Sequence, residues 1–149
     1  MSFKKDYRQG IKNEINIFNK LKEIDNSIKK TTNKLCIIDF YSNNYLYELK
    51  TRNNKLNTFP TTIVGHNKIK YANKLNKSLI IVFSFTDGDY YYKHSTDNLQ
   101  NSKMIINKFV RNSRSDFKDK VADYVYIPVK ELKPLHLLEN EFYSPTSTI

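Results

Sequence analysis

The segment Ser78–Phe85 (SLIIVFSF) is the most continuously apolar part of this chain, and it constrains the fold more than any other feature. A strand with so little polar alternation must be covered on both faces, as in the central sheet of an α/β protein. Asp87 and Gly88 follow as a turn, and Asp89–His94 is predicted to be the antiparallel partner. The chain is therefore predicted to fold as an α/β domain around this strand.

Two segments have the three- and four-residue apolar spacing of amphipathic helices. The first is Lys5–Ile24, with a predicted buried face of Ile11, Ile15, Phe18 and Leu21. The second begins at Ile63 or Gly65 and ends at Leu75, with Ile69, Ala72 and Leu75 on one face.

Farther along the chain the pattern weakens. Met104–Val110 is predicted to form a short helix. Tyr124–Val129 is predicted to be a last strand, at a sheet edge because Pro128 has no N–H to donate.

Length and charge limit the kind of protein. The 149 residues predict one domain over residues 1–143, with a loose tail at 144–149. A formal net charge of +10 favours polyanions such as nucleic acid, although a basic surface also serves solubility alone. With one cysteine, Cys36, and neither a signal peptide nor a membrane span, we expect a soluble intracellular protein that is not attached to a membrane.

A predicted β-hairpin carries the candidate chemistry. Strands Leu35–Tyr41 and Tyr45–Thr51 flank the turn formers Asn43 and Asn44, and a two-residue turn sets Asp39 opposite Glu48. Because side chains alternate along a strand, Glu48 and Lys50 share one face, and Leu49 points to the other.

Two carboxylates placed directly opposite each other repel unless a cation lies between them. Oxygen ligands of this kind suit Mg²⁺, with Mn²⁺ as a substitute. A divalent ion can activate a water molecule and stabilise charge on a phosphate, while the Lys50 amine orients the attacking water. The hairpin therefore predicts phosphodiester hydrolysis. The three histidines are scattered without ligand spacing, and the three glycines form no phosphate-binding loop, which disfavours a zinc enzyme and a nucleotide hydrolase.

Asp39 followed by Glu48-Leu49-Lys50 resembles the signature of the PD-(D/E)XK superfamily of restriction-endonuclease-like nucleases, with Ile38 where the signature has proline. The resemblance implies a mixed central β-sheet flanked by helices and metal ligands at Asp39, Glu48 and the Leu49 carbonyl. It implies a catalytic role for Lys50 and a further acid on the first helix, which Glu14 matches. A solvated helix charge is the alternative for Glu14. The short extra strand of many members would come from residues 28–32.

Some members carry Gln-x-x-x-Tyr on the second helix, where this chain has Asn67 and Tyr71. Tyr71 could equally be a packed aromatic, and His66 a polar neighbour of the helix start. Candidate nucleic-acid contacts, each also compatible with a solvated surface residue, are His66, Asn67, Lys68, Lys70, Tyr71, Arg111 and Arg114.

The expected function is that of a metal-dependent DNA endonuclease, resembling junction resolvases or the homing enzymes of mobile elements. Small members often act as homodimers, so a homodimer is expected. RNA is not excluded as substrate. The alternative is a catalytically inactive nuclease-like module that binds nucleic acid, although binding alone does not require two opposed carboxylates.

Overall fold

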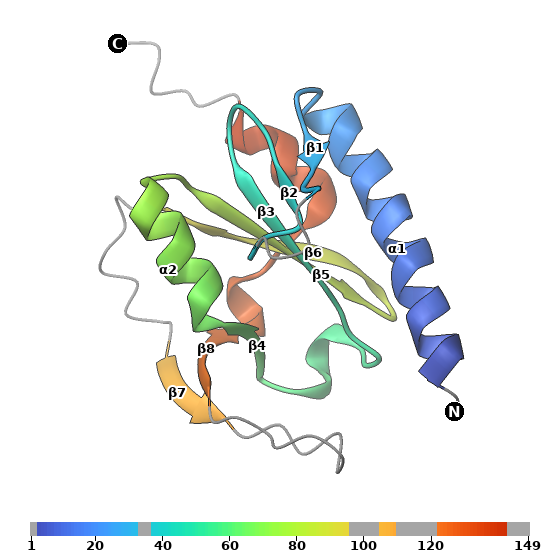
Figure 1. Cartoon of the computed structure of the whole chain (residues 1–149). Helices are drawn as coiled ribbons and strands as arrows, with labels where there is room; N and C mark the ends of the chain where they lie inside the picture. The colour runs from blue at the N-terminus through green and yellow to red at the C-terminus, as the bar shows by residue number, and fades with distance from the viewer. Residues whose placement is uncertain (1–2, 33–36, 96–104, 110–121, 143–149) are drawn as a thin grey trace.

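The computed structural model describes residues 3–32, 37–95, 105–109 and 122–142 of the chain, which form an α/β fold with two sheets (Figure 1). The larger is a mixed six-stranded sheet, and the smaller has three antiparallel strands. In spatial order the larger sheet contains β1 (Lys29–Lys30), β2 (Phe40–Tyr41), β3 (Leu46–Thr51), β5 (Leu79–Phe85), β6 (Gly88–His94) and β9 (Lys133–Pro134). The smaller contains β4 (Thr61–Gly65), β8 (Ala122–Pro128) and β7 (Ile105–Phe109).

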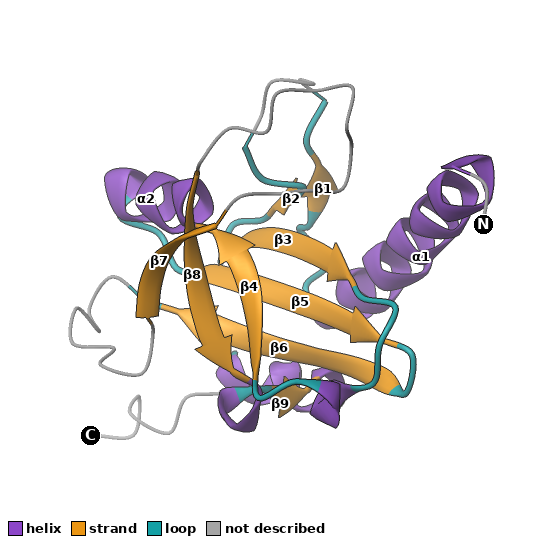
Figure 2. Ribbon diagram, turned by 90° about the horizontal axis from the view of Figure 1, so that it is seen from below, coloured by secondary structure: helices purple, strands orange, loops and turns teal. Residues whose placement is uncertain are grey.

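The helices pack against both faces of the larger sheet. Helix α1 (Phe3–Ile24) lies on one side of it and α2 (His66–Leu75) on the other, where Figure 2 shows α2 next to the smaller sheet. Short 3₁₀ helices complete the chain: η1 (Leu56–Thr58), η2 (Val129–Glu131) and η3 (Leu135–Glu141).

Strand β5 is central, as its apolar sequence predicts. Every residue from Leu79 to Phe85 is buried. The strand runs parallel to β3, with Glu48 opposite Ile81, and antiparallel to β6 through the predicted hairpin. Because β5 alternates its side chains between two hydrophobic cores, it sets the positions of the layers on either side.

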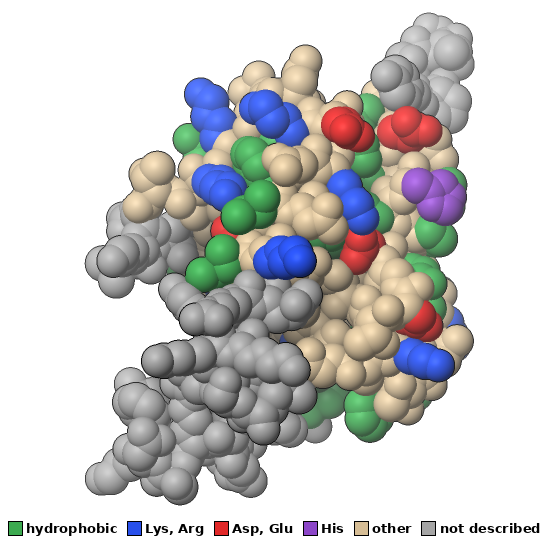
Figure 3. All heavy atoms as spheres, turned by 90° about the vertical axis from the view of Figure 1, so that its right-hand side faces the viewer, with side chains coloured by type: hydrophobic (Ala, Val, Ile, Leu, Met, Phe, Trp, Pro, Cys, Tyr) green, Lys and Arg blue, Asp and Glu red, His purple; other side chains and the backbone are tan. Residues whose placement is uncertain are grey.

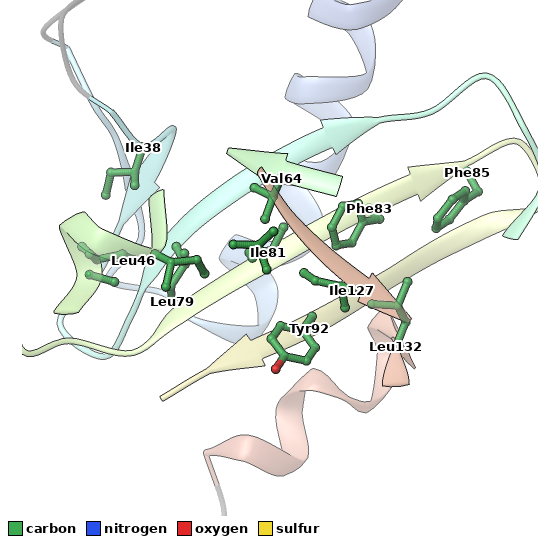
Figure 4. Packing of buried hydrophobic residues seen from close by; sticks show 13 residues of the cluster. Ile38, Leu46, Val64, Leu79, Ile81, Phe83, Phe85, Tyr92, Ile127 and Leu132 are labelled. Carbon is green, nitrogen blue, oxygen red and sulfur yellow. The ribbon is translucent and has the colours of Figure 1, made fainter. Parts of the chain in front are cut away.

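One core lies between the larger sheet and the layer of α2 and the smaller sheet. Figure 4 shows Ile81 and Phe83 of β5 facing Val64 of β4 and Ile127 of β8 across it. Ile69 and Ala72 of α2 are buried here as predicted, but Leu75 at the helix end is 44% exposed, so its predicted burial is wrong.

The second core lies between the other sheet face and α1 with η3. Ile17 and Leu21 of α1 pack there with Ile80 and Val82 of β5. The helix is therefore confirmed, but its predicted buried face is only partly correct. Ile11 and Ile15 are 42% and 48% exposed, because the amino-terminal half of α1 extends past the sheet (Figure 2).

Two predictions for the carboxy-terminal third are wrong. Ile105–Phe109 forms strand β7, because pairing with β8 overrides a local pattern that was compatible with a helix. Strand β8 is the middle strand of the smaller sheet, between β4 and β7. Pro128 is tolerated because it is the last residue of β8, opposite Thr61, and the next N–H, that of Val129, still donates to the Pro60 carbonyl at 3.0 Å.

A buried polar contact connects the end of α1 to the hairpin. The Tyr47 hydroxyl donates to the Asp25 carboxylate at 2.7 Å, and Ser27 and Asn44 also donate to Asp25. Burial alone would raise the pKa of Asp25, but hydrogen bonds from Ser42, Tyr47, Ser27 and Asn44 outweigh it and hold the pKa below its ordinary value.

We expect Tyr47→Phe to lower the free energy of unfolding by about 1–3 kcal/mol at neutral pH, because a hydrogen bond to a buried carboxylate is lost. Because the pKa of Asp25 is lower in the folded protein than its ordinary value of 3.8, ionised Asp25 stabilises the fold at pH values above 3.8. This stabilisation is lost as the pH falls through the folded-state pKa. The difference between wild type and Tyr47→Phe should therefore shrink below pH 3.8. Urea unfolding measures it, with the exposed Tyr41→Phe as the control. A difference that is independent of pH would contradict this assignment.

Candidate active site

The β2–β3 hairpin has the predicted register. Phe40 lies opposite Tyr47 and Tyr41 opposite Leu46, in antiparallel pairing. Leu46 points into the core beneath α2 and Tyr47 into the core beneath α1. Alternation along β3 therefore places Glu48 and Lys50 on the α2 side of the sheet and Leu49 on the α1 side, as predicted.

Asp39 does not continue strand β2. The predicted strand Leu35–Tyr41 is shorter than expected, since β2 covers only Phe40 and Tyr41 and residues 33–36 lie outside the described residues. The Asp39 N–H donates to the Tyr47 carbonyl at 3.1 Å, and the Asp39 carboxylate accepts the Leu49 N–H at 2.8 Å. A side chain thus replaces the main chain as the hydrogen-bond partner of β3.

The main chain of Asp39 is held from its other side as well. Its carbonyl accepts hydrogen bonds from the N–H and the hydroxyl of Thr31, at 3.1 and 3.0 Å. Thr31 directly follows β1 (Lys29–Lys30), the short strand expected from residues 28–32. Asp39 is therefore held by two neighbouring segments, with its carboxylate contacting β3 and its main-chain carbonyl contacting Thr31.

Glu48 is 3% exposed, and its two carboxylate oxygens have different surroundings. Oε2 lies 3.0 Å from the Lys50 Nζ and 3.6 Å from the Lys68 Nζ. Oε1 is buried and has no hydrogen-bond partner. Burial raises the pKa of Glu48 to about 7. The positive charge of Lys50 opposes this rise, the negative charge of Asp39 adds to it, and the positive charge of Lys68 opposes it.

The donor set at this point fits a divalent cation. A buried carboxylate oxygen without a partner is costly, and the nearby Asp39 carboxylate adds repulsion. The main chain supplies a third oxygen. In a β-strand the N–H and C=O of one residue point to the same edge, so the Leu49 carbonyl points to the edge where its N–H meets Asp39. Asp39, Glu48 and Leu49 can therefore offer three hard oxygen ligands to one ion.

Lys68 connects α2 to this centre. Its ammonium donates to the Ile37 carbonyl, just before Asp39, and forms the ion pair with Glu48. Its side chain is only 18% exposed. Lys68, predicted as a nucleic-acid contact, thus also contacts the carboxylate centre, which residue spacing alone did not indicate.

A cavity of about 190 Å³ is lined in part by Lys50 and Lys68, the two lysines that contact Glu48. The cations Lys50, Lys68 and Arg52 line it together with Asn67 at the start of α2. The Arg52 guanidinium donates to the Thr62 hydroxyl and the Ile63 carbonyl and lies 5.8 Å from the centre of the Phe83 ring. Arg52 was not among the sequence candidates, yet it follows Lys50 by two residues on the same strand face.

Helix α2 carries four more of the predicted nucleic-acid contacts. Gly65 lies immediately before the helix, and a Cβ added there would come within 2.6 Å of the Asn67 Oδ1, so glycine allows Asn67 to fold back over the helix start. The His66 Nδ1 is buried without a hydrogen-bond partner. Tyr71 packs against the core, and Lys70 is exposed.

Glu14 is not brought into the carboxylate group. It lies on α1, one turn before Ile17, which packs on the face of the sheet opposite to Glu48. Among the described residues, no cluster of three His, Cys, Asp or Glu side chains suitable for a metal ion occurs. Arg111 and Arg114 lie outside the described residues.

An aspartate directly before one strand and a Glu-x-Lys tripeptide on the neighbouring strand of a mixed sheet, with helices on both faces, are the arrangement of a PD-(D/E)XK nuclease domain. A family model described as "Phage putative PDDEXK endonuclease" matches residues 4–135, and the chain belongs to this family. A search of curated proteins gave no match. None of the helices in the described part of the chain combines the length and apolar character of a membrane span.

The carboxylate pair predicts how metal changes stability. Asp39→Asn keeps an acceptor for the Leu49 N–H but removes the repulsion with Glu48, so its metal-free stability should equal or exceed that of wild type. Saturating Mg²⁺ or Mn²⁺ should stabilise wild type by about 1–3 kcal/mol and the variant far less. Thermal unfolding with and without metal measures both effects.

Asp87→Asn is the matched control, since Asp87 also accepts a backbone N–H, that of Leu56, away from the carboxylate pair. It should respond to metal as wild type does. An equal metal response in Asp39→Asn and wild type would contradict the assigned ligand.

Proposed function

We propose that the protein is a metal-dependent DNA endonuclease that uses Mg²⁺, or Mn²⁺ in its place, to hydrolyse phosphodiester bonds. The observation that carries the proposal is the buried, unpartnered Oε1 of Glu48 next to the Asp39 carboxylate. Membership of the PD-(D/E)XK endonuclease family supports it. A role in junction resolution or element mobility would suit a domain of this size.

The proposed mechanism divides the work among four side chains. Asp39, Glu48 and the Leu49 carbonyl would hold the ion, which when bound acts as a Lewis acid and lowers the pKa of a coordinated water. Lys50, 31% exposed at the cavity, would orient the attacking water and offset charge on the scissile phosphate. Lys68 would position Glu48 and the Ile37–Asp39 segment through its two contacts.

DNA is proposed as the substrate because the cavity next to the carboxylates is lined by cations. A phosphate in that cavity would meet Lys50 and Arg52, and the net charge of +10 would favour binding of the polyanionic backbone. Such contacts position a strand without reading its bases. Lys70, exposed on α2, would extend the same contact surface.

Lys50→Ala should lower the metal-dependent cleavage rate by roughly 100- to 1,000-fold, because one charge that stabilises the transition state is lost. Glu48→Ala should abolish cleavage. Plasmid, linear, junction and single-stranded DNA, with RNA in parallel, are incubated with Mg²⁺ or Mn²⁺ and resolved on gels. Lys74→Ala, an exposed lysine on the same helix as Lys68, is the control and should cleave as wild type does.

Wild-type protein that binds DNA with a steep salt dependence but cleaves nothing with either metal would exclude the nuclease function. The remaining alternative would then be a catalytically inactive nucleic-acid-binding module. Cleavage of RNA alone would keep the chemistry and exclude DNA as the substrate.

We also propose that the protein acts as a homodimer, with α1 as the contact surface. Ile11 and Ile15 are large, exposed and one turn apart on this helix. Figure 3 shows the side of the molecule on which α1 lies, where Lys and Arg side chains are intermixed with Asp and Glu. A second copy docking there would therefore not be repelled by a surface of uniform charge. A two-fold contact would pair the same patch from each copy.

Sedimentation velocity tests this assembly. The double variant Ile11→Lys with Ile15→Lys should sediment as a monomer at concentrations where wild type is dimeric, because four lysines would meet across the two-fold axis. Lys12→Ala, an exposed neighbour on α1, is the control. A monomeric wild type, or a double variant that remains dimeric, would contradict the proposal.

A further inference from the structure

An apolar hollow of about 510 Å³ lies beside the active-site cavity. Its walls include the aromatic rings of Phe59, Phe85 and Tyr126, with Leu56, Pro60 and Val129. Phe59 is 57% exposed, the most exposed of the large hydrophobic residues that the structure describes. The volume is within the range of roughly 300–1,000 Å³ that is usual for ligand sites.

The segment that carries Phe59 is anchored rather than loose. It connects β3 to β4 and runs past the β5–β6 turn (Figure 2). The Thr86 N–H donates to the Asn54 carbonyl at 3.1 Å, and the Leu56 N–H donates to the Asp87 carboxylate at 3.0 Å. The Phe59 ring is therefore presented at a defined place on the surface, at little entropic cost to a ligand that binds there.

The hollow adjoins the site of chemistry. Arg52 and Ile63 line both the hollow and the cavity that contains Lys50 and Lys68. A ligand with an anionic group in the cavity could thus place an attached flat, apolar group in the hollow. A nucleotide has these two parts, a phosphate and a base, in direct succession.

The chemistry of the hollow favours an unpaired base. In a duplex the faces of the bases are stacked and only their edges are presented in the grooves, where they are recognised by hydrogen bonds. Aromatic rings instead bind the face of a base that has left the stack, with little preference among the four bases. The aromatic lining of the hollow is thus matched to a base face and poorly matched to a groove edge.

We propose that the hollow binds an unpaired nucleobase next to the scissile phosphate, so that the substrate is DNA with a single-stranded, mismatched or branched segment at the cleavage point. This proposal rests on the proposed nuclease function. In this proposal the Phe59 ring stacks against the face of the base, and Arg52, which lines both the hollow and the cavity, lies between the base and the phosphate.

The test is binding of fluorescent oligonucleotides to the full chain in the absence of divalent metal, so that nothing is cleaved. Three probes are compared: a single strand, a perfect duplex and the same duplex with one mismatch. The proteins are wild type, Phe59→Ala, Phe59→Tyr and Tyr41→Ala, a control at another aromatic residue that is 41% exposed. 2-Aminopurine at the mismatch reports directly on whether the base leaves its stack and meets an aromatic ring.

We expect wild type to bind the single strand and the mismatch more tightly than the duplex. Phe59→Ala should weaken binding of those two probes roughly 5- to 150-fold, the loss of one base–aromatic stack, and leave duplex binding within about twofold. Phe59→Tyr should retain the preference, and Tyr41→Ala should bind as wild type does.

Equal affinity of Phe59→Ala and wild type for every probe, or an equal loss on all three, would overturn the proposal and leave the hollow to a ligand other than a base. Metal-dependent cleavage by wild type is scored separately. Cleavage by wild type, together with no effect of Phe59→Ala on binding, would contradict the proposed base site and leave the nuclease function standing. A lack of metal-dependent cleavage of every substrate would contradict the proposed nuclease function, whatever the binding data show.

Discussion

The hydrogen bond from the Leu49 N–H to the Asp39 carboxylate is the interaction on which the active site depends. Because β2 starts only at Phe40, a side chain pairs with β3 where a main-chain carbonyl would otherwise do so. This substitution brings the Asp39 carboxylate beside Glu48 and leaves the Leu49 carbonyl directed at the same edge. The arrangement brings the half-buried Asp39 towards the buried Glu48, and the repulsion between the two carboxylates opposes folding, with Lys50 and Lys68 offsetting part of it. The proposed metal-dependent function would account for this arrangement, since it requires converging oxygen ligands.

The rest of the fold holds this geometry in place. Strand β5 is buried on both faces and fixes β3 by parallel pairing from Leu46 to Thr51. The crossover between these two strands contains α2, which brings the Lys68 ammonium to Glu48 and to the main chain before Asp39. The same crossover contains β4 and Phe59, so Lys68, Arg52 of the cationic cavity and Phe59 of the apolar hollow all lie along one connection. A substrate strand crossing this connection would meet charge first and aromatic surface next.

Much of this could be predicted from sequence, because the relevant signals are local. The apolar run of β5, the two-residue hairpin turn and strand alternation gave the central strand, the register and the shared face of Glu48 and Lys50. The smaller sheet could not be predicted, since it pairs Thr61–Gly65 with β8, a strand about 60 residues away, and Ile105–Phe109 becomes a strand by pairing with the other edge of β8. Lys68 was predicted as a nucleic-acid contact, but its ion pair with Glu48 was not predicted, and Arg52 was missed, for the same reason. A lysine on a helix surface shows its partner only when the helix has been placed against the sheet.

The sharing of one divalent ion by Asp39 and Glu48 is the part of the proposed mechanism on which the other residue roles depend. It is tested most directly by a crystal structure of the wild-type protein soaked in Mn²⁺, with the anomalous signal used to locate the metal. We expect one strong peak at about 2.1 Å from an Asp39 oxygen, the Glu48 Oε1 and the Leu49 carbonyl. A peak elsewhere on the protein, or no peak while Glu48 keeps both of its lysine contacts, would contradict it.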